Sequence, residues 1–488
     1  MRISRNLWFP SALAAFAWAF VAASEAFAAD PPIRAGAAVV DATPYLDEPI
    51  VGNFETPPAT HLHDPIQVRA LVLDDGTTRL AFAVVDSVGV SRDVFDAARK
   101  IVAEKTGIPE GNLLGSATHT HSATSGRSRN RLTPDEGGGG MSDYQTFLAR
   151  RIADAVRLAA GNLAPAHVGW GTVDAPEHVF NRRWLLKPGK TVKNPLGGVD
   201  RAQMNPGRNP DRLEYAGPTD PQVAFLAVKT PDGRPIAVLA NYSLHYVGGV
   251  PNGHLSADYF AVFARKLGER LGIDPLHNPP FVGILSNGTS GDVNNIDVQN
   301  PPAAPMAPYA KMALVADDLA KRVAETYAKV EFREGAKLAA ASRELVLKVR
   351  KPTPEELEFA KAVLAKPTDA PRHHNLERNF APRTIEHLDA PAEVTILLQA
   401  FRVGDLGIAA IPFEVFAEMG LEIKAKSPFK PTFTMELANG TYGYLPTPRH
   451  FEIGGYETWL GVNRVEPEAA PKITAVILDL FKGLNAAR

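Results

Sequence analysis

The segment Thr118-His119-Thr120-His121 has the residue types and the spacing that can bind a metal ion or move protons. In an extended chain, residues two positions apart point to the same face, so the two imidazoles can meet one ion. Alternatively, one imidazole binds a metal while the other handles protons, or the segment is an ordinary hydrogen-bonded polar loop. Small polar residues follow at Ser122 and Thr124, which would allow a substrate to approach closely.

Other histidines and one carboxylate are further candidates for binding a metal ion. His245 and Glu414 each follow an apolar run of strand length, so each is either a ligand or a side chain with a structural role. The segment His61-Leu62-His63 repeats the same spacing in a Pro-rich stretch and is a weaker candidate for metal contact. The isolated histidines of polar stretches are expected at the surface: His373, His374, His387 and His450.

Three segments share one order of elements that would position these side chains. Each has a hairpin, a polar residue, a helix, and a strand that opens into a polar loop. The pattern predicts an α/β fold of mixed sheets with helices, with repeated hairpin-helix-strand units around one metal site. The expected hairpins are Val68 to Val85, Val223 to Leu244 and Ile396 to Ile411. The expected helices are Asp93 to Glu104, Ala257 to Leu271 and a segment ending near Lys426.

Polar side chains stand at corresponding strand ends in these units, namely Asp86, His119, His245, Asp292, Glu414 and Tyr444. Since α/β folds place ligand groups at strand ends, these side chains are candidates for one shared site. The pattern leaves open whether Asp86 and Asp292 touch a metal, support loops or bind a second cation. Outside the units, Pro352 to Ala365 is expected to be a helix with Thr353 as its N-cap, and Pro367 to Pro391 a surface excursion.

The composition excludes several classes of protein. The charges nearly balance, with 52 Lys and Arg against 54 Asp and Glu, so nothing favours nucleic acid or an anionic membrane as a partner. The chain has no Cys, which excludes disulfides, thiolate nucleophiles and zinc sites built on Cys. With 488 residues, 45% of them hydrophobic, the chain can bury a large core.

The first 28 residues have the form of a secretory signal peptide. Arg2 and Arg5 precede an apolar stretch from about Leu7 to Ala23, and Ala26-Phe27-Ala28 fits a small-x-small cleavage site. The alternative is a membrane anchor, but the stretch is short for a stable span and Pro10 interrupts it. We therefore expect an exported protein, periplasmic or secreted, with no stable membrane span.

Taken together, the motifs resemble those of the neutral/alkaline non-lysosomal ceramidase family, of which the chain would be a divergent bacterial member. The matching segments occur in family order: Gly36 to Pro44, Thr118 to Ser122, Asn181-Arg182, Asn241 to His245, Gly291 to Val293, Ile411 to Glu414, Asn439 to Thr447 and Tyr456-Glu457. The resemblance spans residues 29–488, which would form a single ceramidase-like catalytic domain. Full-length ceramidases carry a C-terminal immunoglobulin-like domain, which we expect to be missing here because the chain ends soon after the Tyr456 region.

The resemblance implies a Zn2+ ion held by His119, His245, Glu414 and Tyr444. Such a centre would cleave an N-acyl amide bond, as in ceramide, by metal-activated water. His121 would shuttle a proton or hydrogen-bond the bound species. Arg182 and Tyr456 match family residues that stabilise the oxyanion, which completes the set that the resemblance implies.

One position departs from the family pattern. After Gly-Asp-Val the family carries a Ser that is needed for activity, and this chain has Asn294, which we keep as a candidate catalytic residue. Ser290 lies before the Gly and is not equivalent. The departure leaves two alternatives open: a zinc esterase or other hydrolase acting on a small polar substrate, and a non-catalytic exported binding protein on the same scaffold. The sequence does not indicate an oligomeric state.

Overall fold

An eight-stranded mixed sheet forms one half of the structure. The computed structural model describes Met1 and residues 30–127, 140–302 and 304–486. The strand order is β16-β14-β13-β6-β1-β3-β4-β5, antiparallel except for the parallel pairs β4–β5 and β14–β16. The strands are β1 Ile33–Asp41, β3 Gln67–Asp74, β4 Arg79–Val85, β5 Leu113–Ala117, β6 Ala164–Asp174, β13 Gln222–Lys229, β14 Pro235–Tyr242 and β16 Val282–Asn287.

A four-stranded sheet packs face to face against the first. Its strands, in the order β18-β19-β20-β22, are β18 Leu338–Lys348, β19 Glu393–Val403, β20 Leu406–Ala410 and β22 Thr432–Met435. Buried side chains of both sheets form one hydrophobic cluster, in which the rings of Phe82 and Phe401 lie 5.5 Å apart. Apolar residues on both faces of most strands explain why each sheet is covered on both sides.

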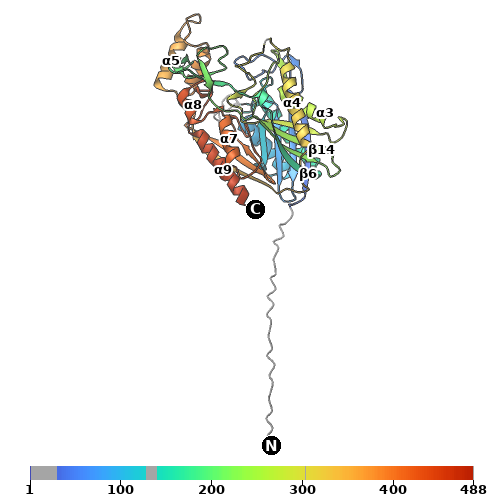
Figure 1. The fold of residues 1–488 in the computed structure, drawn as a ribbon. Helices are drawn as coiled ribbons and strands as arrows, with labels where there is room; N and C mark the ends of the chain where they lie inside the picture. Colours follow the sequence, from blue (N-terminus) through green and yellow to red (C-terminus); the bar gives the residue numbers. More distant parts are fainter. Residues whose placement is uncertain (2–29, 128–139, 303, 487–488) are drawn as a thin grey trace.

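Helices cover the two outer faces and give four layers (Figure 1). On the eight-stranded sheet, α1 Arg92–Thr106 and α2 Asp143–Gly161 pack over one half, and α3 Asp258–Arg270 and α4 Ala310–Tyr327 over the other. On the four-stranded sheet lie α7 Ala417–Lys426 and α9 Ala469–Ala486. The mixed α/β architecture that the sequence predicts is therefore confirmed.

The three predicted hairpin-helix-strand segments all form. In each, an antiparallel hairpin is followed by a helix and by a strand that pairs in parallel with the second hairpin strand: β3-β4-α1-β5, β13-β14-α3-β16 and β19-β20-α7-β22. The first two lie at opposite edges of the large sheet, and the third lies in the small sheet. That they are repeats of one unit stays a prediction.

The remaining elements are short or lie outside the layers. Two helices, α5 Pro354–Ala365 and α6 Glu377–Glu386, pack against each other, and α8 is Pro448–Ile453. The short strands are β2 His61–Leu62, β7 Phe180–Asn181, β8 Arg183–Leu186, β9 Val192–Lys193, β10 Val199–Asp200, β11 Ala202–Met204, β12 Arg212–Tyr215, β15 His254–Leu255, β17 Val293–Asn294, β21 Glu414–Val415 and β23 Tyr444–Leu445.

Local signals explain one of these helices, and tertiary packing explains the other. As predicted, Thr353 caps α5: its hydroxyl accepts from Glu356 N, and the Glu356 side chain accepts from Thr353 N. The expectation that residues 367–391 make a surface excursion is wrong in part, because α6 buries Phe380 completely. Phe380 packs edge-on against Trp459, a contact between distant segments that no local pattern reveals.

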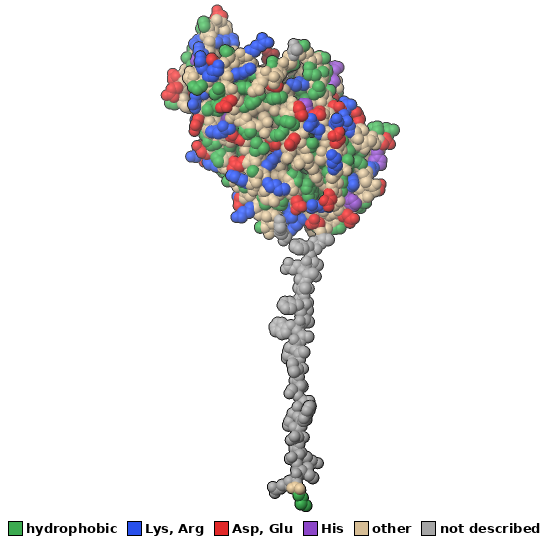
Figure 2. Space-filling view, in the orientation of Figure 1, with side chains coloured by type: hydrophobic (Ala, Val, Ile, Leu, Met, Phe, Trp, Pro, Cys, Tyr) green, Lys and Arg blue, Asp and Glu red, His purple; other side chains and the backbone are tan. Residues whose placement is uncertain are grey.

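Charged side chains of both signs are interspersed on the face shown in Figure 2. No basic tract gathers there, in keeping with the near balance of charge in the sequence. Within the described ranges, no helix combines the length and apolar character that crossing a bilayer requires. The predicted signal peptide lies outside the described residues except for Met1.

Candidate metal centre

Three histidines from two distant loops converge at one point. His119 and His121 follow β5, and His245 follows β14. The Nε2 atom of His119 lies 2.9 Å from Nε2 of His245 and 3.1 Å from Nε2 of His121. His119 has a φ of 71°, in the left-handed region that residues other than Gly rarely adopt. Such strain persists only where surrounding contacts hold the residue in place.

Hydrogen bonds at the opposite ring nitrogen turn two of these imidazoles toward the shared point. His119 Nδ1 donates to the carbonyl oxygen of Val88 at 2.7 Å, and His245 Nδ1 lies 3.2 Å from both oxygens of Ser290. With Nδ1 protonated, each ring presents the lone pair of Nε2 to the centre, as in metal-binding histidines. Burial, then the charges of His119 and Arg182, lower the pKa of His245 well below its ordinary value, which keeps the ring neutral.

Glu414 and Tyr444 complete the cluster from the other half of the structure. They stand opposite each other on the parallel pair β21 and β23. Glu414 Oε2 lies 3.4 Å from His119 Nε2 and 3.7 Å from His245 Nε2, yet this buried oxygen accepts no hydrogen bond among the described residues. Burial acts to raise the pKa of Glu414, but His119, Tyr444 and Arg182 outweigh it and lower that pKa to about 2.

This donor set fits a divalent transition metal. The imidazole nitrogens of His119, His121 and His245 lie within 4.8 Å of one another and form a group that could hold an ion. A buried carboxylate oxygen without a hydrogen-bond donor, beside imidazole nitrogens, is the mixed N and O set that zinc prefers in catalytic sites. The Nε2 atom of His121 belongs to the same group of imidazole nitrogens as those of His119 and His245. Because His121 could itself bind the ion, its predicted role in proton handling stays a prediction.

Two residues that the sequence reasoning missed hold the centre together. Ser290 Oγ, beside His245, donates to Glu436 Oε1 at 2.6 Å, and Glu436 Oε2 accepts from the backbone N of Val415 at 2.7 Å. The fully buried Glu436 thus links the support of His245 to the strand that carries Glu414. A Glu directly after the apolar strand β22 was the available signal, but its partner is distant in sequence.

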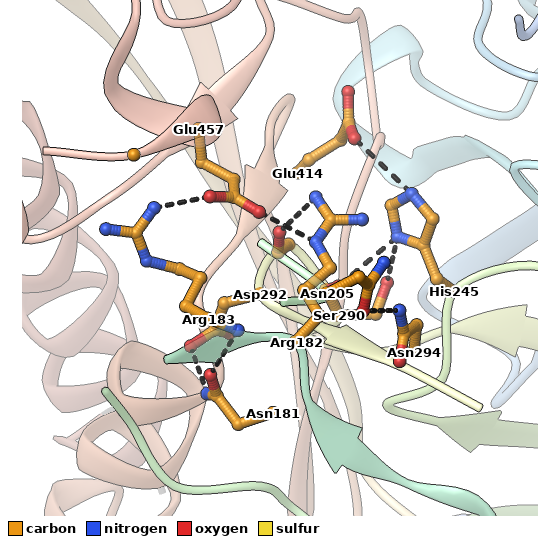
Figure 3. Close-up of polar contacts among 12 residues, drawn as sticks. Asn181, Arg182, Arg183, Asn205, His245, Ser290, Asp292, Asn294, Glu414 and Glu457 are labelled. Carbon is orange, nitrogen blue, oxygen red and sulfur yellow. Dashed lines mark hydrogen bonds and ion pairs between the residues drawn. The ribbon is translucent and has the colours of Figure 1, made fainter. Parts of the chain in front are cut away.

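Arg182 is fixed by a buried network beside the cluster (Figure 3). Its Nε donates to Glu457 Oε1 at 2.7 Å, and its Nη2 donates to the carbonyl oxygen of Gly291 at 2.9 Å. Arg183 donates to the second oxygen of Glu457, so the carboxylate lies between two guanidinium groups. These bonds hold the Arg182 guanidinium 5.1 Å from the ring centroid of Tyr444.

The two aspartates whose role the sequence left open hold neighbouring elements in place. Asp292 Oδ1 accepts from the backbone N of Ala417 at the start of α7, and its Oδ2 accepts from Asn181 Nδ2 at 2.7 Å. Asp86 Oδ2 accepts from Arg69 Nη1 at 2.7 Å. Neither aspartate lies in the group of side chains that could hold a metal.

One cavity of about 1400 Å³ is lined by all eight residues that the sequence predicted for the site: His119, His121, Arg182, His245, Asn294, Glu414, Tyr444 and Tyr456. The rings of Tyr456 and Tyr444 meet edge-on at 5.8 Å. Asn294 Nδ2 donates to Asn205 Oδ1 at 2.8 Å. A further lining residue, Tyr246, stacks on the ring of His121 with centroids 3.8 Å apart, and its importance was missed.

The histidines expected at the surface do not all lie there. His450 is completely buried, and His387 is 8% exposed, so for these two the prediction is wrong. His450 packs edge-on against Phe416, and His387, like His374, lines the cavity. A polar sequence context hides such burial when the covering residues come from distant segments. The pair His61 and His63 is exposed and is not among the residues lining the cavity.

The fold of two packed mixed sheets with helices outside is similar to that of solved ceramidase structures. A crystal structure of neutral ceramidase from Pseudomonas aeruginosa matches with a TM-score of 0.66 and 17% identity, over 94% of this chain and 75% of that chain. A structure described as ceramidase complexed with C2 matches with a TM-score of 0.69 and 17% identity, over 94% and 76%. No family model matches the chain. The ceramidase resemblance of the motifs is thus confirmed for the fold.

Proposed function

We propose that this protein is a zinc-dependent amidohydrolase of the ceramidase family that cleaves an N-acyl amide bond. One observation carries the proposal: three imidazole Nε2 atoms and the Glu414 carboxylate converge on one point of a large cavity. The Oε2 atom of that carboxylate accepts no hydrogen bond among the described residues. Unmetallated, such a cluster would leave nitrogen lone pairs and a carboxylate facing one another in a buried place, which is unfavourable.

The proposed ligands are His119, His245, Glu414 and Tyr444, with His121 adjoining them. Zinc bound there would supply a Lewis acid for the scissile carbonyl and lower the pKa of water to near neutrality. The chain supplies the orientation of the donors: the Val88 carbonyl fixes one imidazole, and Ser290 fixes the other.

The chain also supplies groups for charge and proton transfer. Arg182, held by Glu457 and Gly291, and the phenol of Tyr456 line the cavity and would stabilise negative charge on the carbonyl oxygen of the substrate. Burial and the neighbouring His119 lower the pKa of His121 well below its ordinary value, so its ring is neutral and can accept a proton at a nitrogen.

The cavity suits an acylated substrate with a polar end. Apolar side chains such as Phe54, Trp459 and Val462 share its wall with polar ones such as Gln203 and Asn294. The similarity to solved structures of ceramidases supports a lipid-like N-acyl substrate. We propose that residues 29–488 act as one catalytic unit in a periplasmic or secreted protein.

Zinc content measured together with hydrolysis tests this proposal. Purified mature protein is incubated with a fluorogenic ceramide, simple N-acyl amides and matched esters, with and without a chelator. We expect amide hydrolysis that the chelator abolishes and added Zn2+ restores. His119→Ala should lose both metal and activity, because it removes the imidazole closest to two other ligands.

His277→Ala is the matched control, since this histidine lies in a loop away from the cavity and should leave metal and rate unchanged. Hydrolysis that persists in chelator would refute the proposal. Cleavage of esters alone would replace it with the esterase alternative. Zinc bound without turnover of any member of the panel would favour a binding protein on this scaffold.

A further inference from the structure

A second group of histidines lies on the surface, away from the cavity. His61 on β2 is the direct register partner of His254 on the parallel strand β15. Their ring centroids lie 4.4 Å apart, with the two planes tilted by 43°. None of the residues of this group, which also includes His63 and Tyr309, lines the cavity.

The geometry of the His61–His254 pair suits chelation. Side chains of directly paired residues on neighbouring strands lie on the same face of the sheet and within reach of each other. Bonds of about 2.0–2.1 Å from each imidazole to zinc require ring nitrogens a little over 3 Å apart, which neighbouring rings reach by small rotations. His61 is exposed and has no hydrogen bond to its ring in the described part of the chain, so its nitrogens are accessible.

Tyr309 orients the second imidazole. Its hydroxyl lies 2.5 Å from His254 Nδ1, so the opposite nitrogen of His254, Nε2, is left for a ligand. A partner on the second ring nitrogen is the arrangement that fixes metal-binding histidines. His63 is engaged elsewhere, because its ring stacks on Tyr309 at 3.7 Å with the two planes 6° apart.

We propose that His61 and His254 form a second, surface site for a divalent transition metal such as Zn2+ or Cu2+, with water completing the coordination. Imidazoles suit these ions, and Cu2+ should bind most tightly of the first-row series. The proposal is independent of the catalytic proposal, since the two groups share no residue.

The site would act on the segment that holds the catalytic loop. The strand of His254 continues into Ser256, whose backbone N donates to the Ser122 carbonyl oxygen at 2.8 Å. The Ser256 carbonyl oxygen accepts from Thr120 Oγ1, also at 2.8 Å, between His119 and His121. An ion that joins β2 to β15 therefore stabilises the anchor of that loop.

Metal stoichiometry tests the proposal on the full chain. Protein stripped of metal is dialysed against Zn2+, and bound zinc is measured by atomic emission. We expect two ions per wild-type chain, and one in His61→Asn and in His254→Asn. His63→Asn is the matched control, because this neighbouring exposed histidine is not a proposed ligand, and it should keep two ions.

The buried site can be separated from the surface site in the same assay. Glu414→Gln should lose the buried ion and keep the surface ion. The second equivalent of zinc should also raise the melting temperature of wild type and of His63→Asn but not that of His61→Asn. An ion count in His61→Asn equal to that of wild type, or a count in His63→Asn lower than that of wild type, would each overturn the assignment.

Discussion

Replacing Glu457 by Gln should destabilise the protein strongly, because this carboxylate compensates two buried guanidinium groups. Glu457 is completely buried, and Arg182 and Arg183 each donate to one of its oxygens. The amide of Gln can accept with one oxygen only, and its NH2 group would face a guanidinium. Removing one partner of a buried ion pair costs about 3–5 kcal/mol, since it leaves buried charge uncompensated.

The size of the chain sets the shift in melting temperature. With an unfolding entropy of about 2.1 cal/mol/K per residue, 488 residues give about 1 kcal/mol/K, so the variant should melt about 3–5 °C lower. Burial acts to raise the pKa of Glu457, but Arg183 and Arg182 outweigh it and lower that pKa below its ordinary value of 4.5. The stabilisation is therefore fully present above pH 4.5 and is lost as the pH falls further.

The assay is thermal unfolding followed by circular dichroism at pH 7 and again at pH 4. Glu177→Gln is the control, because this carboxylate is 56% exposed in its pair with Arg322 and should change the stability by less than about 1 kcal/mol. Glu457→Gln should also lower turnover, since Arg182 loses its anchor. A variant that melts within about 1 °C of wild type at pH 7 would refute the reasoning.

Ser290→Ala should weaken zinc binding about 10- to 100-fold in competition with a chelator, because His245 loses a contact at Nδ1; an unchanged affinity would contradict this role. Tyr246→Leu should lower kcat several-fold at unchanged zinc content, because His121 loses its stacking partner, whereas Tyr246→Phe should retain the rate. Equal rates for the two variants would count against a role for this stacking. Burial is the main cause that raises the pKa of Asp258 to about 6, whereas the ordinary value is 3.8, so the stability of the fold should fall as the pH rises from about 3.8 to about 6. In Asp258→Asn the melting temperature should depend less on pH across this range. The same dependence on pH as in wild type would exclude Asp258 as its cause.

Much of the fold follows from local signals in the sequence. The hairpins and α1 agree closely with the apolar runs, and α5 begins where Thr353 predicts. The missed features depend on distant contacts. The course of α6 is set by packing of Phe380 on Trp459, and a hydrophobic pattern alone does not say which segment will cover it.

Two signals assembled the candidate site from the sequence: polar side chains at the strand ends, and ordered motifs that pointed to one family. Spacing alone joined His119 to His121 and left His245 and Glu414 as separate candidates. Glu436 was missed because a lone carboxylate after a strand gains its meaning from a hydroxyl far away in the chain. Polar side chains that hold metal ligands in place do not follow a fixed spacing in the sequence, so a pattern of residues does not reveal them.

The origin of the cluster in both sheets has a consequence for how the protein matures. The imidazoles follow strands of the large sheet, whereas Glu414 and Tyr444 follow the small sheet, late in the chain. A nascent chain that stops short of Glu414 contains every histidine of the cluster but no carboxylate to oppose them. The centre that we propose can therefore form only after nearly the whole chain has been synthesised, and translation products that stop before Glu414 would lack a proposed ligand even though their histidines are intact.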